Sequence, residues 1–486
     1  MHGRAFTYGE LEEATRRAAS RLADLSEGLP EGRVAMIATP DFPTIGTLLG
    51  IWRAGRVAVP LASSFPRSEL EYVIGDAEAV AVASDEQSAA LVQPLAAAAG
   101  ARFVTFNQLI ESDVTNGPGD IETGSTPALM MYTSGTTGRP KGVVATHGNV
   151  AAWIRTLVEA WEWSADDRAL LVLPLHHTHG LINVVGSALW AGATCELMPR
   201  FDPEATWERL ASGDITVFTA VPTIYQRLIA SWEAATPTQQ RARRAGASRA
   251  RLMMSGSAAL PIPVLERWRE ITGHTLLERY GMTEIGMALS NPLSGERRPG
   301  VVGTPLPGVD VRLVDADGRE IESGLQGELE VRGPGVFKEY WRRPDVTRQA
   351  FRDGWFRTGD VAVVDRGAYR LLGRTSTDIL KTGGEKISAI EIEEVLRLHP
   401  VVLDCAVVGV PDERWGDRVC VAAELRADAD LSLPELQAWV KDRLAPPKVP
   451  KQLLCVESLP RNAMGKVVKS EVIALFRKVG PPARGD

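Results

Sequence analysis

The 486-residue sequence predicts an α/β protein: a large N-terminal region of two doubly wound α/β halves plus a small β-barrel, followed by a small α+β C-terminal domain. Three observations predict it. Short apolar runs alternate with helical stretches through most of the chain, which is typical of parallel sheets covered by helices. Short alternating strands between glycines and prolines begin at about residue 303. A piece of roughly 110 residues, large enough for its own core, ends the chain.

The individual elements follow from local patterns. A capping box at Thr7 to Glu10 precedes a helix that carries Leu11, Ala14, Ala18 and Leu22 on one face. Helices are also expected before Gly55, at 149–163 and at 180–190. The strands predicted in the two halves are 33–38, 56–61, 80–83, 102–106, 127–131, 169–173, 194–197, 215–220, 251–254 and 275–278.

The pattern of predicted helices and strands changes twice after these halves. Strands at 309–314 and 327–332 predict a β-rich subdomain at about 303–373. After the string GRTSTD we expect helix 389–398, strands 404–410 and 418–425, helix 433–444, strand 453–456 and a final helix. We therefore predict an N-terminal domain at 1–373 and a C-terminal domain at 374–486.

Composition excludes several classes of function. The net charge of −7 and the pI near 5.7 argue against a nucleic-acid partner, because no basic excess exists to neutralise phosphates. The four cysteines show no CxxC pair or zinc-ligand spacing, which favours buried thiols in a reducing compartment. No apolar run of about 20 residues and no signal peptide is evident, so we expect a cytoplasmic protein without a membrane partner. Composition does not predict the oligomeric state.

The stretch YTSGTTGRPKG, from Tyr132 to Gly142, has the chemistry of a polyphosphate site. Its glycines let backbone N–H groups approach a phosphate, its hydroxyls donate hydrogen bonds, and its lysine neutralises charge. A surface loop is the alternative, and the spacing differs from the Walker form. The candidate nucleotide-binding residues here are Thr133, Ser134, Gly135, Thr136, Thr137, Gly138 and Lys141.

Two later strings place polar side chains on turns. In YGMTE, Thr283 could meet an α-phosphate, Glu284 could hold Mg²⁺ through its hard oxygen atoms, and Tyr280 offers a face to a purine. In WFRTGD, Asp360 could accept both hydroxyls of a ribose. Each string could instead be an ordinary structural turn.

Five strings in order, TSGTTGRPKG, YGMTE, WFRTGD, GRTSTD and PRNAMGK, resemble the signatures of the adenylate-forming superfamily of acyl-CoA synthetases, adenylation domains and luciferases. The resemblance implies ATP and Mg²⁺ as cofactors, coenzyme A as co-substrate, and a mobile C-terminal domain. It assigns catalysis to Lys466 together with Thr283 and Glu284. It further implies nucleotide contacts from Ser257, Ala258, Ala259, Tyr280, Gly281, Met282, Asp360 and Arg374, and coenzyme A contacts from Lys381, Gly383, Gly384 and Glu385. Where the family usually has a charged hinge residue, this chain has Ser376, which can still absorb a backbone rotation.

Two segments bear on the acid that is activated. PLHHTHGL places His177 and His179 beside a pocket-forming loop, and GERRPGVVG presents Arg297 and Arg298. Both segments resemble those of malonyl-CoA synthetases. The resemblance implies that Arg297, ahead of Arg298, binds the second carboxylate of malonate, with Ser255 also lining the pocket; a solvated arginine pair is the alternative.

The resulting prediction is an ATP-dependent malonate–CoA ligase that also accepts methylmalonate. Alternatives are an aryl- or fatty-acyl-CoA ligase, a free-standing adenylation domain that loads a carrier protein, and a nucleotide- or CoA-binding regulator without catalysis.

Overall fold

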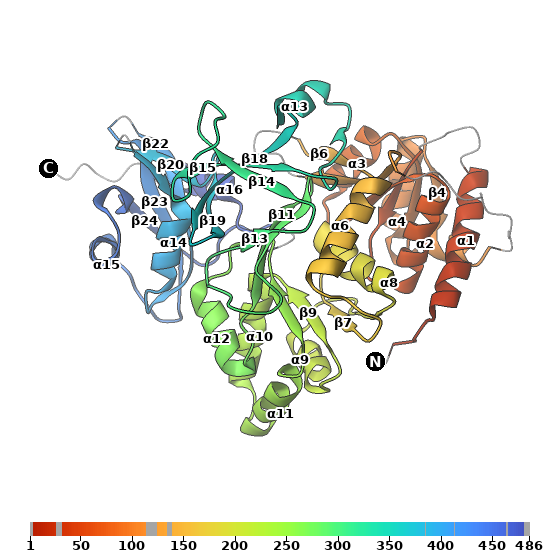
Figure 1. Ribbon diagram of the computed structural model, residues 1–486, viewed down its shortest axis with the longest axis horizontal. Helices are drawn as coiled ribbons and strands as arrows, with labels where there is room; N and C mark the ends of the chain where they lie inside the picture. Colours follow the sequence, from red (N-terminus) through yellow and green to blue (C-terminus); the bar gives the residue numbers. More distant parts are fainter. Residues whose placement is uncertain are drawn as a thin grey trace.

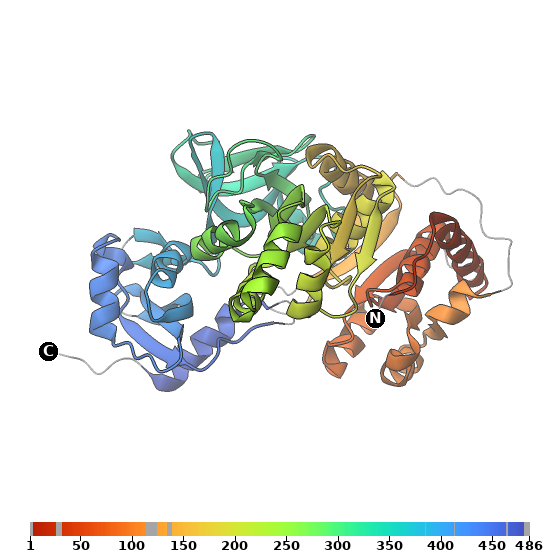
Figure 2. The same ribbon diagram turned by 90° about the horizontal axis from the view of Figure 1, so that it is seen from below.

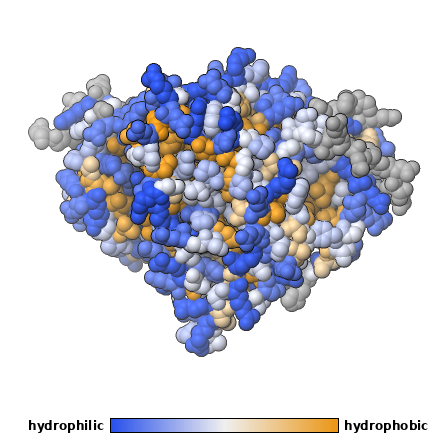
Figure 3. Space-filling view, in the orientation of Figure 1, coloured by the Kyte–Doolittle hydropathy of each residue, from blue (hydrophilic) through white to orange (hydrophobic). Residues whose placement is uncertain are grey.

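Two seven-stranded sheets organise the N-terminal region of the computed structural model, which describes residues 3–25, 32–112, 124–133, 139–383, 385–412, 414–462 and 465–480. The views in Figures 1 and 2 follow the chain from the first sheet in red, through a lobe in green and a β-rich layer in teal, to the C-terminal unit in blue. On the face shown in Figure 3, hydrophilic residues are interspersed with hydrophobic ones.

The first sheet has the order β16-β6-β5-β2-β1-β3-β4, with parallel pairing among β1 to β5 and antiparallel pairing of β6 to both of its neighbours. Its strands are β1 (Arg33–Ile37), β2 (Val57–Leu61), β3 (Ala79–Ser84), β4 (Arg102–Thr105), β5 (Pro127–Thr133), β6 (Lys141–Thr146) and β16 (Glu339–Tyr340). The helices of this part are α1 (Tyr8–Leu25), α2 (Phe42–Arg53), α3 (Arg67–Asp76), α4 (Glu86–Ala98), α5 (Phe106–Ile110) and α6 (His147–Ala160). The capping box before α1 is confirmed: the Thr7 and Glu10 side chains each accept a hydrogen bond from the other residue's backbone N–H.

The second sheet has the order β13-β12-β11-β10-β9-β7-β8, with parallel pairing among its strands from β7 to β11. Its strands are β7 (Arg168–Leu171), β8 (Thr194–Leu197), β9 (Val217–Ala220), β10 (Leu252–Ser255), β11 (Leu277–Met282), β12 (Gly286–Ser290) and β13 (Thr304–Pro305). The helices are α7 (Thr178–Gly180), the π-helix η1 (Leu181–Gly186), α8 (Ser187–Ala191), α9 (Pro203–Ala211), α10 (Pro222–Ala234), α11 (Pro237–Ala247) and α12 (Ile262–Thr272). The predicted helix at 180–190 is therefore interrupted by a π-helical turn.

One apolar core joins the two sheets. It contains side chains from β1 of the first sheet, such as Met36, and from β9 and α12 of the second, such as Phe218 and Trp268. The other face of the first sheet packs on α3 and α4 through Val73 and Leu95. Because burial of such side chains is the main favourable term in folding, the shared core fixes the two sheets relative to each other.

A five-stranded antiparallel sheet follows, with β19 pairing to β18 beside the path β14-β15-β18-β17. It consists of β14 (Asp310–Val314), β15 (Gln326–Arg332), β17 (Phe351–Arg352), β18 (Trp355–Asp365) and β19 (Ala368–Arg374), and α13 (Pro344–Gln349) lies between its strands in sequence. These strands form the predicted β-rich subdomain, and their pairings within the described residues follow an open path.

The last sheet, in blue in Figure 1, has the order β21-β20-β23-β22, with β24 on β23. Its elements are β20 (Ile379–Thr382), β21 (Glu385–Ser388), α14 (Ala389–Arg397), β22 (Val402–Asp412), β23 (Gly416–Leu425), α15 (Leu433–Lys441), the 3₁₀ turn η2 (Pro446–Lys448), β24 (Gln452–Val456) and α16 (Lys469–Val479). Separate apolar clusters contain residues of α14 and α15 in one case and of α16 in the other. The predicted domain boundary at Arg374 lies between this sheet and the preceding one.

The search for membrane-spanning segments covered the described residues. None of the helices there is long and apolar enough to cross a bilayer.

Candidate active site

The predicted phosphate loop joins two antiparallel strands. Thr133 ends β5 and pairs in register with Lys141, the first residue of β6. The Lys141 ammonium lies 4.1 Å from the centre of the Tyr340 ring. The remaining predicted contacts of this loop, Ser134, Gly135, Thr136, Thr137 and Gly138, fall outside the described residues, so their roles stay predictions.

The YGMTE string lies where β11 turns back into the antiparallel β12. Tyr280, Gly281 and Met282 end β11, and Thr283 and Glu284 occupy the turn. The Glu284 carboxylate is 5% exposed and accepts a hydrogen bond of 2.9 Å from the Tyr340 hydroxyl. Burial raises the pKa of Glu284, while this hydrogen bond and the Lys141 charge oppose the rise. Tyr340 thus brings together a cation from the phosphate loop and a buried carboxylate from the second string.

Asp360 connects three of the predicted strings. It lies on β18 opposite Arg374 of β19, whose Nε donates a 2.9 Å hydrogen bond to Asp360 Oδ1. The Tyr280 hydroxyl donates to Asp360 Oδ2 at 2.6 Å. Nη2 of Arg374 also donates to Oδ2, at 3.5 Å. A carboxylate has about four acceptor positions, so these three bonds leave room for a ribose hydroxyl.

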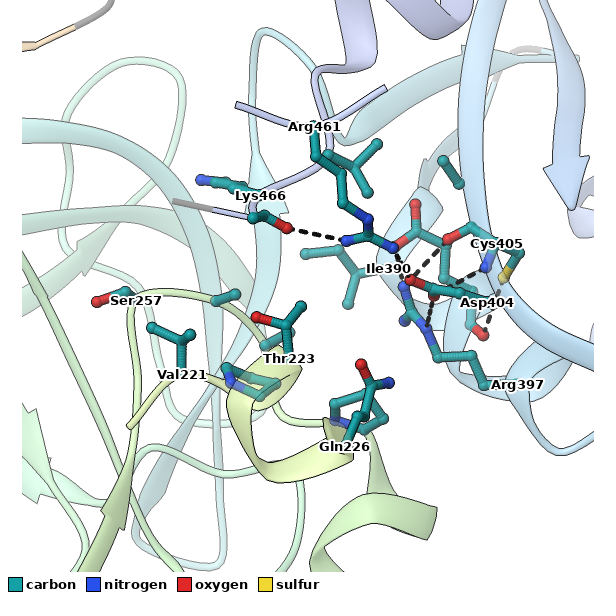
Figure 4. Close-up of a pocket in the computed structure, with 18 of the residues that line it drawn as sticks. Val221, Thr223, Gln226, Ser257, Ile390, Arg397, Asp404, Cys405, Arg461 and Lys466 are labelled. Atoms are coloured by element: carbon teal, nitrogen blue, oxygen red, sulfur yellow. Dashed lines mark hydrogen bonds and ion pairs between the residues drawn. The ribbon is translucent and has the colours of Figure 1, made fainter. Parts of the chain in front are cut away.

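Lys466 lies at a cavity of about 200 Å³ between the N-terminal region and the C-terminal unit (Figure 4). The cavity is lined on one side by Ser257, Ala258 and Ala259, and on the other by Lys466 and its neighbours. Burial and the nearby Arg374 lower the pKa of Lys466, while Asp378 and Asp360 oppose that shift. The charges that act on Lys466 therefore include Arg374 and Asp360, which are hydrogen-bonded to each other.

His179 organises a second, more enclosed region. One ring nitrogen lies 3.1 Å from Ser257 Oγ and the other 2.8 Å from Thr219 Oγ1. Burial, reinforced by the Arg279 charge, lowers the pKa of His179 well below its usual value, and burial lowers that of His177 to about 4. Both rings are therefore neutral at physiological pH.

The histidine cluster is not accompanied by further metal ligands. No group of three or more His, Cys, Asp or Glu in the described part of the chain could hold a metal ion. Ser255 ends β10 nearby, and its hydroxyl is buried without a hydrogen-bond partner. This region is therefore a polar wall with capacity for a further acceptor or donor.

Arg279, on β11, is the cation of this region, and the sequence analysis missed it. It is buried, and its Nε and Nη2 atoms have no hydrogen-bond partner within the part of the chain that the structure describes. A Cβ atom added to Gly256 would lie only 2.4 Å from the guanidinium carbon, so the guanidinium lies directly against that glycine. Burial lowers the pKa of Arg279 to about 10, which leaves it charged at neutral pH.

The adjacent Glu278 does not neutralise Arg279. Successive side chains of a strand point to opposite faces, and Glu278 accepts a 3.1 Å hydrogen bond from the Gly300 backbone N–H. Burial raises the pKa of Glu278 to about 8, and the negative charge of Glu394 on α14 adds to this rise.

The geometry argues against the predicted roles of Arg297 and Arg298. The Nε, Nη1 and Nη2 atoms of Arg297 donate to the backbone carbonyls of Pro292, Thr275 and Leu293 at 2.5–3.0 Å. Arg298 donates to the Asp365 carbonyl at 2.9 Å and pairs with the Asp365 carboxylate. Both guanidinium groups are therefore engaged: Arg297 binds backbone carbonyls of Thr275 and of its own loop, and Arg298 binds Asp365 at the end of β18.

Comparisons with known proteins agree with this constellation. Residues 1–341 match the family described as "AMP-binding enzyme", and residues 391–466 match its C-terminal domain. The chain belongs to the AMP-binding enzyme family. The predicted superfamily is thereby confirmed, as is the predicted fold class.

Several relatives in this family are similar over nearly the whole chain. The mitochondrial malonate–CoA ligase of Homo sapiens is 44% identical over 98% of this chain and 89% of its own length. A malonate–CoA ligase of Arabidopsis thaliana is 42% identical over 97% and 84%. A feruloyl-CoA synthase of an Amycolatopsis species is 37% identical over 98% and 94%. The human relative is named as a mitochondrial protein, so the cytoplasmic location that we expect for this chain stays a prediction.

Solved structures of the family differ in how closely they superpose on this chain. ATP-bound MatB from Rhodopseudomonas palustris is 35% identical, covers 98% of this chain and 95% of its own, and superposes with a TM-score of 0.89. A malonyl-CoA ligase product complex with methylmalonyl-CoA and AMP is 36% identical and covers 95% and 96%, yet its TM-score is 0.69. The two structures have nearly the same identity to this chain and nearly the same coverage. The higher TM-score therefore means that the three-dimensional arrangement of this chain is closer to that of the ATP-bound protein.

In this arrangement the predicted coenzyme A segment forms the β20–β21 hairpin. Lys381 lies on β20 and Glu385 begins β21, while Gly384 falls outside the described residues. Gly383 has φ +58° and donates its N–H to the Trp415 carbonyl. Arg414 and Lys451 flank the Trp415 ring, with ring-centre distances of 5.1 and 4.7 Å. The hairpin is thus next to an aromatic ring surrounded by cations.

One signal in the sequence could have identified Arg279. The predicted strand at 275–278 was ended before this residue, whereas the real strand continues through YGM. An arginine inside a buried strand that leads directly into the second string has no solvent to face. Extending the strand by one residue would have marked Arg279 as a candidate for the pocket.

Proposed function

We propose that the protein is an AMP-forming ligase that activates malonate with ATP and transfers the malonyl group to coenzyme A. The observation that carries this proposal is the buried Arg279 guanidinium, which lies against Gly256 near His179 and has two nitrogen atoms without a partner among the described residues. The relatives named malonate–CoA ligase support the same substrate. Coenzyme A and ATP are supported by the neighbouring structures named with ATP or methylmalonyl-CoA.

In the first half-reaction, one malonate carboxylate attacks the α-phosphorus of ATP, which forms malonyl-adenylate and expels pyrophosphate. Lys466 is the mobile cation for this step: it lies at the cavity between the two parts of the molecule and can contact both the attacking carboxylate and the α-phosphate. Asp360 and Arg374 hold the ribose side, and Tyr280 offers its ring to the adenine. Catalysis here consists of positioning and charge neutralisation by groups that are already in place.

Glu284 suits Mg²⁺, which binds through one or two carboxylates together with substrate phosphates. Its carboxylate is buried and accepts a hydrogen bond from Tyr340 at one oxygen, which leaves acceptor positions for the ion. When bound, the ion would neutralise phosphate charge; Lys141, beside the same Tyr340, contributes a fixed cation at that end.

Arg279, in place of Arg297, is our candidate for the distal carboxylate of malonate. A buried cation without a partner costs several kcal/mol, and a second carboxylate would remove that cost. A guanidinium also binds a carboxylate through two parallel N–H donors, which fixes its orientation. A monocarboxylic acid of similar size would leave the same cation unpaired, which disfavours it.

In the second half-reaction, the coenzyme A thiol attacks the acyl carbon of malonyl-adenylate, AMP leaves and the thiol proton is lost. We propose that the C-terminal domain rotates about Ser376 between the halves, so that Lys466 moves away and the Lys381–Glu385 hairpin approaches. The Trp415 ring with Arg414 and Lys451 gives that hairpin the aromatic and cationic neighbours that a nucleotide-containing thiol requires.

The test is AMP formation with Mg·ATP and coenzyme A on a panel of acids: malonate, methylmalonate, succinate, acetate, benzoate and ferulate. We expect malonate to show the highest kcat/KM, methylmalonate to follow, and acetate to be at least about 100-fold lower. Highest activity with benzoate or ferulate would replace the proposal with an aryl-CoA ligase. Acyl-adenylate formation without any thioester would point to a carrier protein as the acceptor.

A further inference from the structure

The backbone that carries Lys466 is clamped by its neighbour Arg461. Nη1 of Arg461 donates a 2.9 Å hydrogen bond to the carbonyl of Gly465, the residue directly before the lysine (Figure 4). Asn462 shapes the same turn, because its side chain accepts from the Lys466 N–H at 3.0 Å and its own N–H donates to the Lys466 carbonyl at 2.9 Å.

The clamped turn is pressed against the N-terminal region. Gly465 has φ +76°, and a Cβ atom added to it would lie 3.2 Å from Thr223 Oγ1, in the first turn of α10. A side chain at this position would therefore meet both backbone strain and a close neighbour from the other side of the cavity. Small shifts of the turn translate directly into displacement of the Lys466 ammonium, since no other part of the lysine is held in place by a described side chain.

A buried chain of charges anchors Arg461 from behind. Its Nη2 pairs with Asp404 Oδ2 at 2.5 Å, and Asp404 Oδ1 accepts from Arg397 Nε at 2.9 Å. Burial would raise the pKa of Asp404, but the two guanidinium groups outweigh it and lower that pKa. The carboxylate therefore stays charged at neutral pH and holds Arg461 through a charge-assisted bond.

The residues after Lys466 are fixed to the same acidic frame. The Lys469 ammonium pairs with Glu393 at 2.8 Å and with Asp378 at 2.5 Å. Arg461 and Lys469, on either side of Lys466 in the sequence, both form ion pairs. Lys466 itself forms no ion pair with any described residue. The neighbouring cations thus occupy the nearby carboxylates, and the Lys466 charge remains available to a ligand.

We propose that Arg461 is a positioning residue for the adenylation half-reaction, acting through the Gly465 carbonyl and anchored by Asp404. The inference rests on the proposed function, in which Lys466 serves adenylation and withdraws before thioester formation. Arg461 therefore affects only the half-reaction in which Lys466 takes part.

The two half-reactions are measured separately in the full-length protein. Adenylation is followed by malonate-dependent exchange of pyrophosphate into ATP, and thioester formation by AMP release from supplied malonyl-adenylate and coenzyme A. We expect Arg461→Ala to slow adenylation about 10- to 100-fold, with KM values within about threefold, and to change thioester formation by less than about threefold. Arg461→Lys retains the pair with Asp404 but cannot span both partners, so it should show the same selective loss if the alanine variant folds poorly.

Arg426→Ala is the matched control, because this exposed arginine also donates to a backbone carbonyl of the C-terminal unit, that of Pro400, away from the lysine. It should leave both rates unchanged. A double-mutant cycle completes the test: in a Lys466→Ala background, Arg461→Ala should cost no further adenylation. Equal losses in both half-reactions, additive losses in the cycle, or no loss at all would overturn the proposal. Failure of wild-type enzyme to use malonate would contradict the proposed function instead, and the same comparison would then be made with the acid that is turned over.

Discussion

The two ends of the candidate active site differ in whether their charged side chain has a protein partner. At the nucleotide end, Asp360 is met by Arg374 and by the Tyr280 hydroxyl before any ligand binds. At the acid end, Arg279 is buried with two nitrogen atoms unpaired among the described residues, and the His179 ring on which its charge acts is neutral. The nucleotide end is therefore preorganised by protein partners, whereas the acid end is completed only by a ligand that brings negative charge.

The largest effect is expected where the ligand must supply the partner. Arg279→Met should lower kcat/KM for malonate about 1,000-fold, because the second carboxylate loses both of its donors in a buried pocket. The same change removes an unpaired buried charge, so the thermal unfolding midpoint should stay the same or rise. Steady-state AMP release and a thermal melt measure the two quantities.

Arg297→Ala is the matched comparison for that variant. Its three donors hold backbone carbonyls, so we expect a lower unfolding midpoint and a kcat/KM for malonate within about threefold of wild type once folded. If Arg297→Ala abolished malonate use while Arg279→Met retained it, the assignment of the two arginines would be reversed.

A smaller effect at the acid end should follow from crowding. In Gly256→Ala the added Cβ would lie 2.4 Å from the Arg279 guanidinium carbon, so the guanidinium must move. We expect kcat/KM for malonate to fall about 10- to 100-fold, with KM for ATP nearly unchanged. Gly75→Ala is the control, since nothing lies within 4 Å of its added Cβ and it lies inside α3. Unchanged malonate kinetics in Gly256→Ala would show that the guanidinium position does not matter.

The nucleotide end should respond more weakly to the loss of one partner. Tyr280→Phe keeps the ring but removes the hydrogen bond to Asp360, whose other oxygen remains bonded to Arg374. We expect KM for ATP to rise about three- to tenfold, in line with about 1 kcal/mol for one hydrogen bond, and KM for malonate to stay constant. A loss as large as that of Arg279→Met would remove the contrast between the two ends.

Local patterns predicted most of the fold because apolar runs and caps are local properties. The β5 and β8 strands and the capping box before α1 are examples. The β6 strand was missed because it begins with Lys141 inside a string that was interpreted as a loop. The π-helical turn within 180–190 was missed because an uninterrupted apolar sequence does not reveal a change of helical pitch.

The candidate site divides in the same way. Glu284 and Asp360 could be proposed from the sequence because a carboxylate on a turn suggests its own chemistry, whereas Lys466 could be proposed only from the resemblance of PRNAMGK to the superfamily. The pocket cation could not, because choosing among Arg279, Arg297 and Arg298 depends on which backbone carbonyls lie within reach of each guanidinium. That information exists only after the strands and loops have come together.

The last prediction concerns the pH dependence of stability, through Glu278 beside the acid end. Burial raises the pKa of Glu278 to about 8 from the usual 4.5. Below about pH 4.5 both the folded and the unfolded state carry the proton, and the stability linked to this group is fully present. As the pH rises toward 8 the unfolded state ionises while the folded state does not, so wild-type stability falls across that window.

Glu278→Gln cannot ionise and should escape this loss. Its unfolding midpoint relative to wild type should therefore increase by several degrees between pH 5 and pH 8, measured by thermal melts in matched buffers. The exposed Glu322→Gln makes the same chemical change at the surface and should show a constant difference across that range. A midpoint difference for Glu278→Gln that is flat with pH would mean that Glu278 is already ionised in the folded protein, with the nearby Gly300 N–H sufficient to hold its charge.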